Sequence, residues 1–298
     1  MHLAQRWVLV TGASGGLGRD IARELAENHG ANLILLARRE ARLRELAAEL
    51  QQKHGIETEV LAADLSRAAE AERVGAYLAQ RPLAGVVLNA AVTHYGHVLD
   101  QSVGDLTRML QTNIASVVHL SRVFADSMAR RREGGSIMFV TSLTALSPFP
   151  TQTVYGASKA FLNQYGLGLA HEMAPLGVRV TVFAPGGIAT EMLEVSGLDR
   201  KFRADQIGMM HSRRCAKFAV SALVRGRRFS VPGLLNQLLA ALMRWAPRPL
   251  VTRTVARMYD AGTHTRWRRT QCLGAPTAST PPPSQPNDAE PPGDEART

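Results

Sequence analysis

Short apolar runs alternate with longer amphipathic segments from residue 7 to about residue 184. The apolar runs are rich in Val, Ile and Leu, and they lie at residues 6–12, 32–37, 58–64, 85–91, 135–142 and 178–186. Strands that are buried on both faces of a parallel sheet have this composition. The segments between them carry apolar residues at helical spacing, as Leu17, Ile21 and Leu25 do before a helix stop at Gly30. The pattern predicts repeated βαβ units.

We therefore expect an α/β fold of Rossmann type, with one doubly wound parallel sheet and helices on both of its faces. The run "RRFSVPG" at residues 227–233 predicts a short additional strand, which brings the sheet to about seven strands. No boundary is evident before about residue 270, so residues 1–270 are predicted to form a single domain. Residues 275–298 are mostly Pro, Ser, Thr and acidic residues, which predicts a disordered tail.

A glycine-rich turn, "TGASGGLG" at residues 11–18, directly follows the first predicted strand. Its glycines, Gly12, Gly16 and Gly18, permit a tight turn, the approach of a pyrophosphate to the backbone, and close packing of the next helix on the sheet. The N-terminus of that helix offers free N–H groups and the positive end of its dipole to phosphates. We call residues 11–18 the phosphate turn, and we expect Ser14 and Leu17 to share in binding the cofactor.

The end of the second predicted strand indicates which dinucleotide is bound. Binders of NAD commonly place an acidic residue there, whereas this chain has Ala37 followed by Arg38 and Arg39. A guanidinium group suits a 2′-phosphate, so we predict that Arg38 binds NADP(H), with NAD(H) less favoured. The alternative is that both arginines begin the exposed face of the next helix. Asp64, at the end of the third predicted strand, either accepts a hydrogen bond from the adenine or caps the following helix.

The segment "YGASK" places a tyrosine and a lysine one helical turn apart. Residues four apart share a helix face, so Tyr155 and Lys159 would point the same way over a floor of small residues. A phenol has a pKa of about 10, and a nearby cation lowers it. We expect Lys159 to lower the pKa of Tyr155 and form an acid–base pair with it; an ordinary helix with a chance pair is the alternative.

The phosphate turn and "YGASK", in this order, resemble the short-chain dehydrogenase/reductase family, and the resemblance covers about residues 5–260. Three further motifs match the family: "ADL" on the adenine side, "LNAA", and "PGGIAT" where the nicotinamide carboxamide is held. The second departs from the family's Asn-Asn-Ala-Gly at Leu88 and Ala91. The resemblance implies cofactor contacts from Asp64, Leu65, Asn89, Tyr155, Lys159, Ile188 and Thr190.

The resemblance also implies four catalytic residues, which are Asn113, Ser142, Tyr155 and Lys159. In the family the tyrosine is the general acid or base, and the lysine lowers its pKa and binds the nicotinamide ribose. The serine hydrogen-bonds the substrate oxygen, and the asparagine holds a water that relays protons. Each residue also has a structural interpretation: Ser142 as a strand-end cap, Asn113 as a helix irregularity and Tyr155 as a half-buried aromatic.

Taken together, these features predict an oxidoreductase that transfers a hydride between NADP(H) and a carbonyl or secondary alcohol. The alternative is a cofactor-binding sensor or scaffold protein with little turnover. The family places its substrate cover at about residues 187–212, and apolar side chains there favour a hydrophobic small-molecule substrate over a sugar. No metal is expected, because Cys215, Cys272 and the scattered histidines match no metal spacing.

The net charge of +10 is concentrated near the C-terminus, since residues 213–269 contain thirteen Lys or Arg residues and one acid. A basic region can attract nucleic acid, anionic lipid or acidic substrates, but we favour a solvated surface here and expect no nucleic acid partner. The two cysteines and the lack of a signal-peptide pattern predict a cytoplasmic protein.

The segment from about residue 233 to residue 260 predicts C-terminal helices, and it resembles the end of a bacterial subgroup often called DltE-like. A broad leucine stripe at residues 234–243 is followed by arginines. We favour packing of this stripe within the protomer or across a subunit interface, in keeping with an expected homo-oligomer. Peripheral contact with an anionic membrane is the less favoured alternative.

Overall fold

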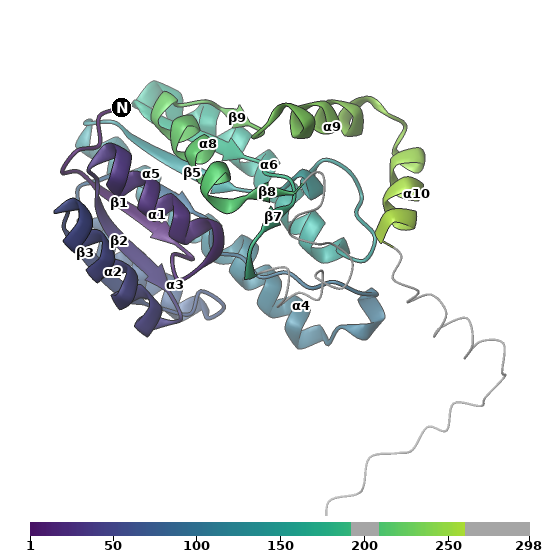
Figure 1. Ribbon diagram of the computed structural model, residues 1–298, viewed down its shortest axis with the longest axis horizontal. Coiled ribbons are helices and arrows are strands. Elements are labelled where there is room, and N and C mark those ends of the chain that lie inside the picture. Colours follow the sequence, from purple (N-terminus) through teal and green to yellow (C-terminus); the bar gives the residue numbers. More distant parts are fainter. Residues whose placement is uncertain (192–208, 260–298) are drawn as a thin grey trace, which may run out of the picture. The chain divides into compact units, whose positions relative to one another are not determined.

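The computed structural model describes residues 1–191 and 209–259 (Figure 1). The chain divides into Met1–Ala261 and Gly262–Thr298, and all the described residues belong to the first of these units. The predicted tail at residues 275–298 and much of the predicted substrate cover lie outside the described residues, as does the predicted domain end at residue 270.

The core of the protein is a seven-stranded sheet with the order β3-β2-β1-β4-β5-β6-β9, in which all neighbouring strands are parallel. This confirms the predicted doubly wound α/β fold. The strands are β1 (Trp7–Thr11), β2 (Asn32–Ala37), β3 (Thr58–Ala62), β4 (Leu83–Leu88), β5 (Gly135–Val140), β6 (Val178–Phe183) and β9 (Phe229–Ser230).

Helices cover both faces of the sheet, because successive strand residues point to opposite sides. In β1, Val8 and Val10 pack in one hydrophobic core and Leu9 packs in the other. The first core is closed by α1 (Gly16–His29), α2 (Glu40–His54) and α8 (Ser212–Arg225). The second is closed by α3 (Ala68–Ala79), α5 (Ser116–Arg131) and α6 (Thr153–Met173). The short helix α4 (Val103–Leu110) precedes α5 (Figure 1).

Two short strands outside the main sheet were not predicted. The strand β7 (Ile188–Ala189) pairs in parallel with β8 (Met210–His211). Two-residue strands are too short to show a periodic pattern, which is why the sequence gives no sign of them. The predicted strand at 227–233 is present, but only Phe229–Ser230 pairs with β6.

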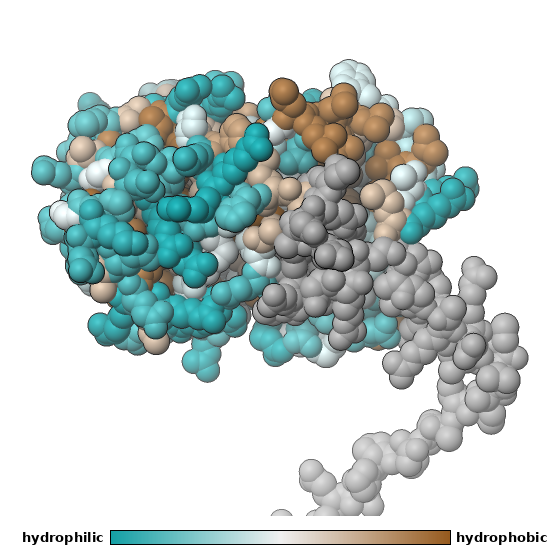
Figure 2. Space-filling model, in the orientation of Figure 1, coloured by the Kyte–Doolittle hydropathy of each residue, from teal (hydrophilic) through white to brown (hydrophobic). Residues whose placement is uncertain are grey.

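The C-terminal helices are α9 (Leu234–Trp245) and α10 (Arg248–Tyr259), as predicted for this segment. Of the two packing arrangements predicted for the leucine stripe, packing within the protomer is wrong for α9, and packing across a subunit interface stays a prediction. This helix buries Asn236 and Ala240 and turns its leucines outward, and they contribute to the brown surface at the upper right of Figure 2. None of the helices in the described part of the chain is long and apolar enough to cross a membrane.

Helix α6 lies close to the sheet because a glycine faces it. A Cβ atom on Gly166 would lie 2.6 Å from the Val182 side chain and 3.1 Å from Phe139, whereas a Cβ on Gly168 would meet nothing within 4 Å. We expect Gly166→Ala to lower the free energy of unfolding by about 1–3 kcal/mol through overpacking. The matched variant Gly168→Ala should raise it by roughly 0.5–1 kcal/mol. Urea denaturation measures both, and shifts of the same sign would contradict this packing.

Candidate active site

The phosphate turn is held by a close approach of the backbone to itself. Gly12 has a φ of +70°, a conformation that favours glycine. A Cβ atom on Gly18 would lie 2.3 Å from the Gly12 carbonyl oxygen and 2.6 Å from the Asn89 side chain. Both distances are far below a normal contact, so only glycine fits at position 18.

Asn89 supports the turn from the neighbouring strand. Its backbone N–H donates to the Thr11 hydroxyl at 2.9 Å, and its side-chain amide donates to the Thr11 carbonyl at 3.0 Å. These bonds join the end of β1 to the end of β4, directly beneath Gly12 and Gly18. The predicted cofactor residue Asn89 therefore shapes the phosphate turn from below.

The start of α1 is suited to an anion. Gly15 precedes the helix without a side-chain cap, and the first turn holds no acidic residue. Its N–H groups and the positive end of the helix dipole are therefore available to a phosphate. Arg39 adds a cation here, because its Nε donates to the Ser14 hydroxyl at 3.2 Å. A dinucleotide with its pyrophosphate on this turn fits the residues present.

Arg38 and Arg39 are both exposed, and Arg39 is the one that contacts the turn. Arg39 also contacts Glu191 at 3.0 Å, and Arg42 contacts the same carboxylate at 2.8 Å. The hydrogen bond from Arg39 is the main cause of the lowered pKa of Glu191. The sequence did not point to Glu191 or Arg42, because Glu191 is far from both arginines along the chain.

The other predicted cofactor residues lie at the same edge of the sheet, in different settings. The Asp64 carboxylate accepts from the Ser66 N–H at 3.1 Å in the turn before α3, whose N-cap residue is Arg67, so the cap considered for Asp64 is not found. Leu65 is buried in the hydrophobic core beneath this edge. Thr190 follows β7 and lies against the turn, since a Cβ on Gly16 would be 3.3 Å from its side chain. Ile188 packs against the core from β7.

Three of the predicted catalytic residues converge at the end of β5. Ser142 follows β5, and its hydroxyl accepts from the Thr144 N–H at 3.1 Å, which is the capping role considered for it. The same hydroxyl hydrogen-bonds the phenol of Tyr155, in the first turns of α6. Lys159 lies one turn further along α6, with its ammonium 5.7 Å from the centre of the Tyr155 ring.

Burial dominates the electrostatics of this group. The Lys159 side chain is 2% exposed and donates to the Val140 carbonyl at 2.8 Å. Loss of water lowers the pKa of Lys159 to about 8 and raises the pKa of Tyr155 to about 12, against the opposing effect of the Ser142 hydrogen bond. The expected lowering of the phenol pKa by Lys159 is therefore not found in this structure. The reason is that burial disfavours the phenolate more than the neighbouring groups favour it.

Asn113 lies on a third element, the five-residue π-helix Gln111–Ala115 between α4 and α5. Its side chain is fully buried and joins two segments. It accepts from the Val92 N–H at 2.9 Å and donates to the Val92 carbonyl at 2.9 Å and to the Ser158 hydroxyl at 3.1 Å. Both amide hydrogens are thus used within the protein. The helix irregularity considered for Asn113 is real, and single π-turns are frequent at functional sites.

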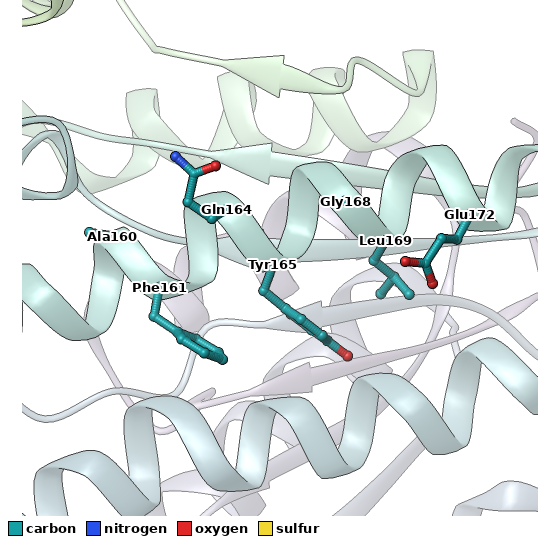
Figure 3. Close-up of a pocket in the computed structure, with 7 residues that line it drawn as sticks. All are labelled: Ala160, Phe161, Gln164, Tyr165, Gly168, Leu169 and Glu172. Atoms are coloured by element: carbon teal, nitrogen blue, oxygen red, sulfur yellow. The ribbon is translucent and has the colours of Figure 1, made fainter.

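A hollow of about 570 Å³ lies further along α6, away from this group (Figure 3). Phe161 and Tyr165 point into it with their rings stacked at 5.9 Å, and the Tyr165 hydroxyl contacts the Ser121 hydroxyl on α5 at 3.0 Å. The hollow is lined by Ala160, Phe161, Gln164, Tyr165, Gly168, Leu169 and Glu172. None of these residues belongs to the predicted site.

Residues 6–201 match the family model described as short chain dehydrogenase. The chain is 33% identical over 201 residues to an uncharacterized oxidoreductase, YmfI, of Bacillus subtilis, covering 67% of this chain and 82% of that one. It is 31% identical over 195 residues to a very-long-chain 3-oxoacyl-CoA reductase of Anas platyrhynchos, covering 64% of this chain and 62% of that one.

A solved structure similar to this chain is described as a short-chain dehydrogenase from Sphingobium yanoikuyae in complex with NADPH. The two share 25% sequence identity with a TM-score of 0.72, and the match covers 93% of this chain and 98% of the other. The likeness therefore extends over nearly the whole length of both proteins.

The burial of Lys159 generates a prediction about stability and pH. The fall in its pKa from 10.5 to about 8 means that the charged side chain costs roughly 3 kcal/mol in the folded state. This cost is complete below pH 8 and disappears as the pH rises to 10.5. We expect Lys159→Met to be more stable than the parent protein near neutral pH, by up to about 2 kcal/mol once the lost bond to Val140 is allowed for.

The advantage of the Met variant should vanish as the pH approaches 10.5. Urea denaturation at several pH values measures it, with the exposed Lys217→Met as the matched control, for which little change is expected. An advantage that grows with pH would contradict the burial of a charged lysine.

Proposed function

This chain belongs to the short-chain dehydrogenase family, and we propose that it transfers a hydride between NADP(H) and a carbonyl or secondary alcohol. The family supports the general reaction, which is oxidation and reduction of such groups with a nicotinamide dinucleotide. The observation that carries the proposal is the convergence of Ser142, Tyr155 and Lys159 at the end of β5, on the same edge of the sheet as the phosphate turn.

In the proposed reaction, the bound nicotinamide supplies or accepts the hydride. Tyr155 donates its phenolic proton to the substrate oxygen during reduction and takes it back during oxidation. Its raised pKa keeps that proton in place at neutral pH. The Ser142 hydroxyl, which already hydrogen-bonds the phenol, donates to the same substrate oxygen as negative charge develops there.

Lys159 orients and polarises the site in this proposal. Its ammonium is held between the Val140 carbonyl and the Tyr155 ring, a position from which it would also bind the ribose of the cofactor. Asn113 would act as a positioning residue, since it ties Val92 to Ser158, the residue before Lys159. The backbone of this π-turn is where a relay water would be held.

We propose NADP(H) over NAD(H) because the region around the phosphate turn is cationic. Arg39 contacts Ser14 on the turn, and Arg38 is exposed beside it without an acid at position 37. A 2′-phosphate placed here would gain charge-assisted hydrogen bonds. Glu191 competes for the same guanidinium in this structure.

We further propose a hydrophobic substrate, such as a bulky ketone or a 3-oxoacyl chain. Ile188 and Met210, at the two ends of the substrate cover, are apolar and partly buried. The relative from Anas platyrhynchos, by its name, reduces very long 3-oxoacyl-CoA chains, which is consistent with this class. Membership of the DltE-like subgroup also remains a proposal, because the family match ends at residue 201.

We also propose a cytoplasmic homo-oligomer. Cys215 is a buried free thiol, as expected in a reducing compartment. The exposed ring of Phe161 on α6 lines both the hollow of Figure 3 and a second hollow on α5. An aromatic groove of this kind suits the face of a second copy. A sensor or scaffold role stays the alternative to an enzyme.

We expect Tyr155→Phe to keep cofactor binding and to lower turnover at least 100-fold, since it removes only the transferable proton. The measurement is NADPH oxidation with a panel of hydrophobic ketones, aldehydes and 3-oxoacyl thioesters, beside a fluorescence titration of NADPH. A variant that turns over any confirmed substrate at the parental rate would refute the mechanism. Binding of NADPH without turnover of any carbonyl by the parent protein would favour the sensor role.

Arg39 and Glu191 form an ion pair, and the cofactor proposal predicts that substitutions of these two residues change NADPH binding in opposite directions. Arg39→Gln should weaken NADPH binding about tenfold or more and NADH binding much less, and Arg38→Asp should act in the same direction. Glu191→Gln should strengthen NADPH binding, because it frees Arg39 for the 2′-phosphate. Titration of both cofactors against all three variants tests this. Parental binding of NADH that is as tight as that of NADPH would contradict the proposal.

A further inference from the structure

Helix α9 has its apolar side chains on the outside. The exposed fractions of Leu234, Leu238, Leu242 and Trp245 are 84%, 68%, 61% and 84%. The face that packs against the protein carries Asn236 and Ala240 instead. An ordinary surface helix turns its apolar stripe toward the core, so this helix has the reverse orientation, and Figure 2 shows the resulting apolar area.

This orientation is held by contacts on the inner faces of α9 and α10. The Asn236 side chain donates to the Pro232 carbonyl at 3.0 Å and lies against Gly186, where a Cβ atom would be 2.6 Å away. Helix α10 packs its buried side chains, Val251 and Val255, against Phe149 in front of α6. The inner faces of α9 and α10 therefore pack against the rest of the protein, and this packing leaves the leucine face of α9 on the outside.

The surroundings of this face are strongly basic. Six exposed arginines lie just before β9, in the last turn of α9 and in α10, namely Arg227, Arg228, Arg244, Arg248, Arg253 and Arg257. Residues 209–259 contain no Asp or Glu. Within the described residues none of these arginines forms an ion pair, although many other arginines of the chain do.

We propose that α9 and its flanking arginines dock on the surface of an anionic phospholipid bilayer. Apolar side chains would enter the boundary between headgroups and acyl chains, and the arginines would contact lipid phosphates. The helix has 12 residues, about 18 Å, so it would lie in the plane of the membrane. Trp245 at its end is a residue type enriched at this interface.

A second copy of the chain fits this face less well. In a symmetric dimer the same patch meets itself, so exposed arginines of one copy would approach those of the other, with no acid among residues 209–259 to separate them. Like charges at an interface are unfavourable. A bilayer with phosphates on its surface complements both the leucines and the arginines. The proposal does not depend on the catalytic activity.

The test uses the full-length protein and sedimentation with two kinds of vesicle, phosphatidylglycerol mixed with phosphatidylcholine, and phosphatidylcholine alone. We expect binding to the anionic vesicles at least tenfold tighter than to the neutral ones, and weaker binding at about 0.5 M salt, where charges are screened within a few ångströms. Leu238→Glu should reduce anionic vesicle binding at least tenfold with an unchanged melting temperature. The matched control Leu176→Glu, also at an exposed leucine, should bind like the parent.

Two further variants keep the test decisive if Leu238→Glu fails to fold. The double variant Arg244→Gln with Arg248→Gln should lose much of the preference for anionic vesicles. In the parent, Trp245 emission should shift to the blue on binding, and Trp245→Phe should lose that part of the shift. A parent that does not bind anionic vesicles overturns the proposal, as does binding unaffected by these variants. A drop in solution mass caused by Leu238→Glu, without vesicle binding by the parent, would assign the face to a second copy.

Discussion

Burying both faces of a parallel sheet leaves the ends of its strands as the place where polar side chains can gather. The strands β1 to β6 place side chains in two hydrophobic cores, one on each face of the sheet. The polar residues of the site accordingly lie just beyond the strands: Thr11 ends β1, Asn89 follows β4, and Ser142 follows β5. The hydrogen bonds from Asn89 to Thr11 then join two of these ends and give the phosphate turn its shape.

The same burial sets the chemistry of the site. A phenol and an amine placed one turn apart on α6 are both pushed toward their neutral forms, since neither is well hydrated. The polar contacts that remain come from single groups. The Ser142 hydroxyl hydrogen-bonds the phenol, and the Val140 carbonyl accepts from the Lys159 ammonium. At the other end of the site, the uncapped start of α1 and the Arg39 guanidinium leave a cationic region.

The sequence predicted the features that depend on local spacing. Apolar runs located the strands of the main sheet, and the glycines of the phosphate turn and the pair Tyr155 and Lys159 were recognisable from their positions. The sequence alone could not predict properties that depend on which groups surround a side chain in the folded protein. The spacing of Tyr155 and Lys159 placed them together, but the direction of the phenol pKa depends on burial. The ion pair between Arg39 and Glu191 joins two segments that are far apart in the sequence, so no local sequence pattern predicts it.

The orientation of helix α9 could not be predicted from the sequence for the same reason. Helical periodicity identified the leucine stripe, but periodicity defines a face and not the side of the protein that the face meets. The inner face was set instead by Asn236 fitting against Gly186, a contact between residues whose types suggest no pairing.

The pairing of β7 with β8 brings together the two ends of the segment that is predicted to cover the substrate. The Met210 N–H donates to the Gly187 carbonyl at 2.9 Å, next to the pairs Ile188 with Met210 and Ala189 with His211. These contacts join the two ends of the segment between β7 and β8. The entropic cost of closing a loop grows by only about 0.6 kcal/mol for each doubling of the loop length. We therefore expect changes in the length of this segment to alter the stability of the Rossmann core only slightly. Variation of this segment between relatives would leave the residues at the ends of β1, β4 and β5 in place.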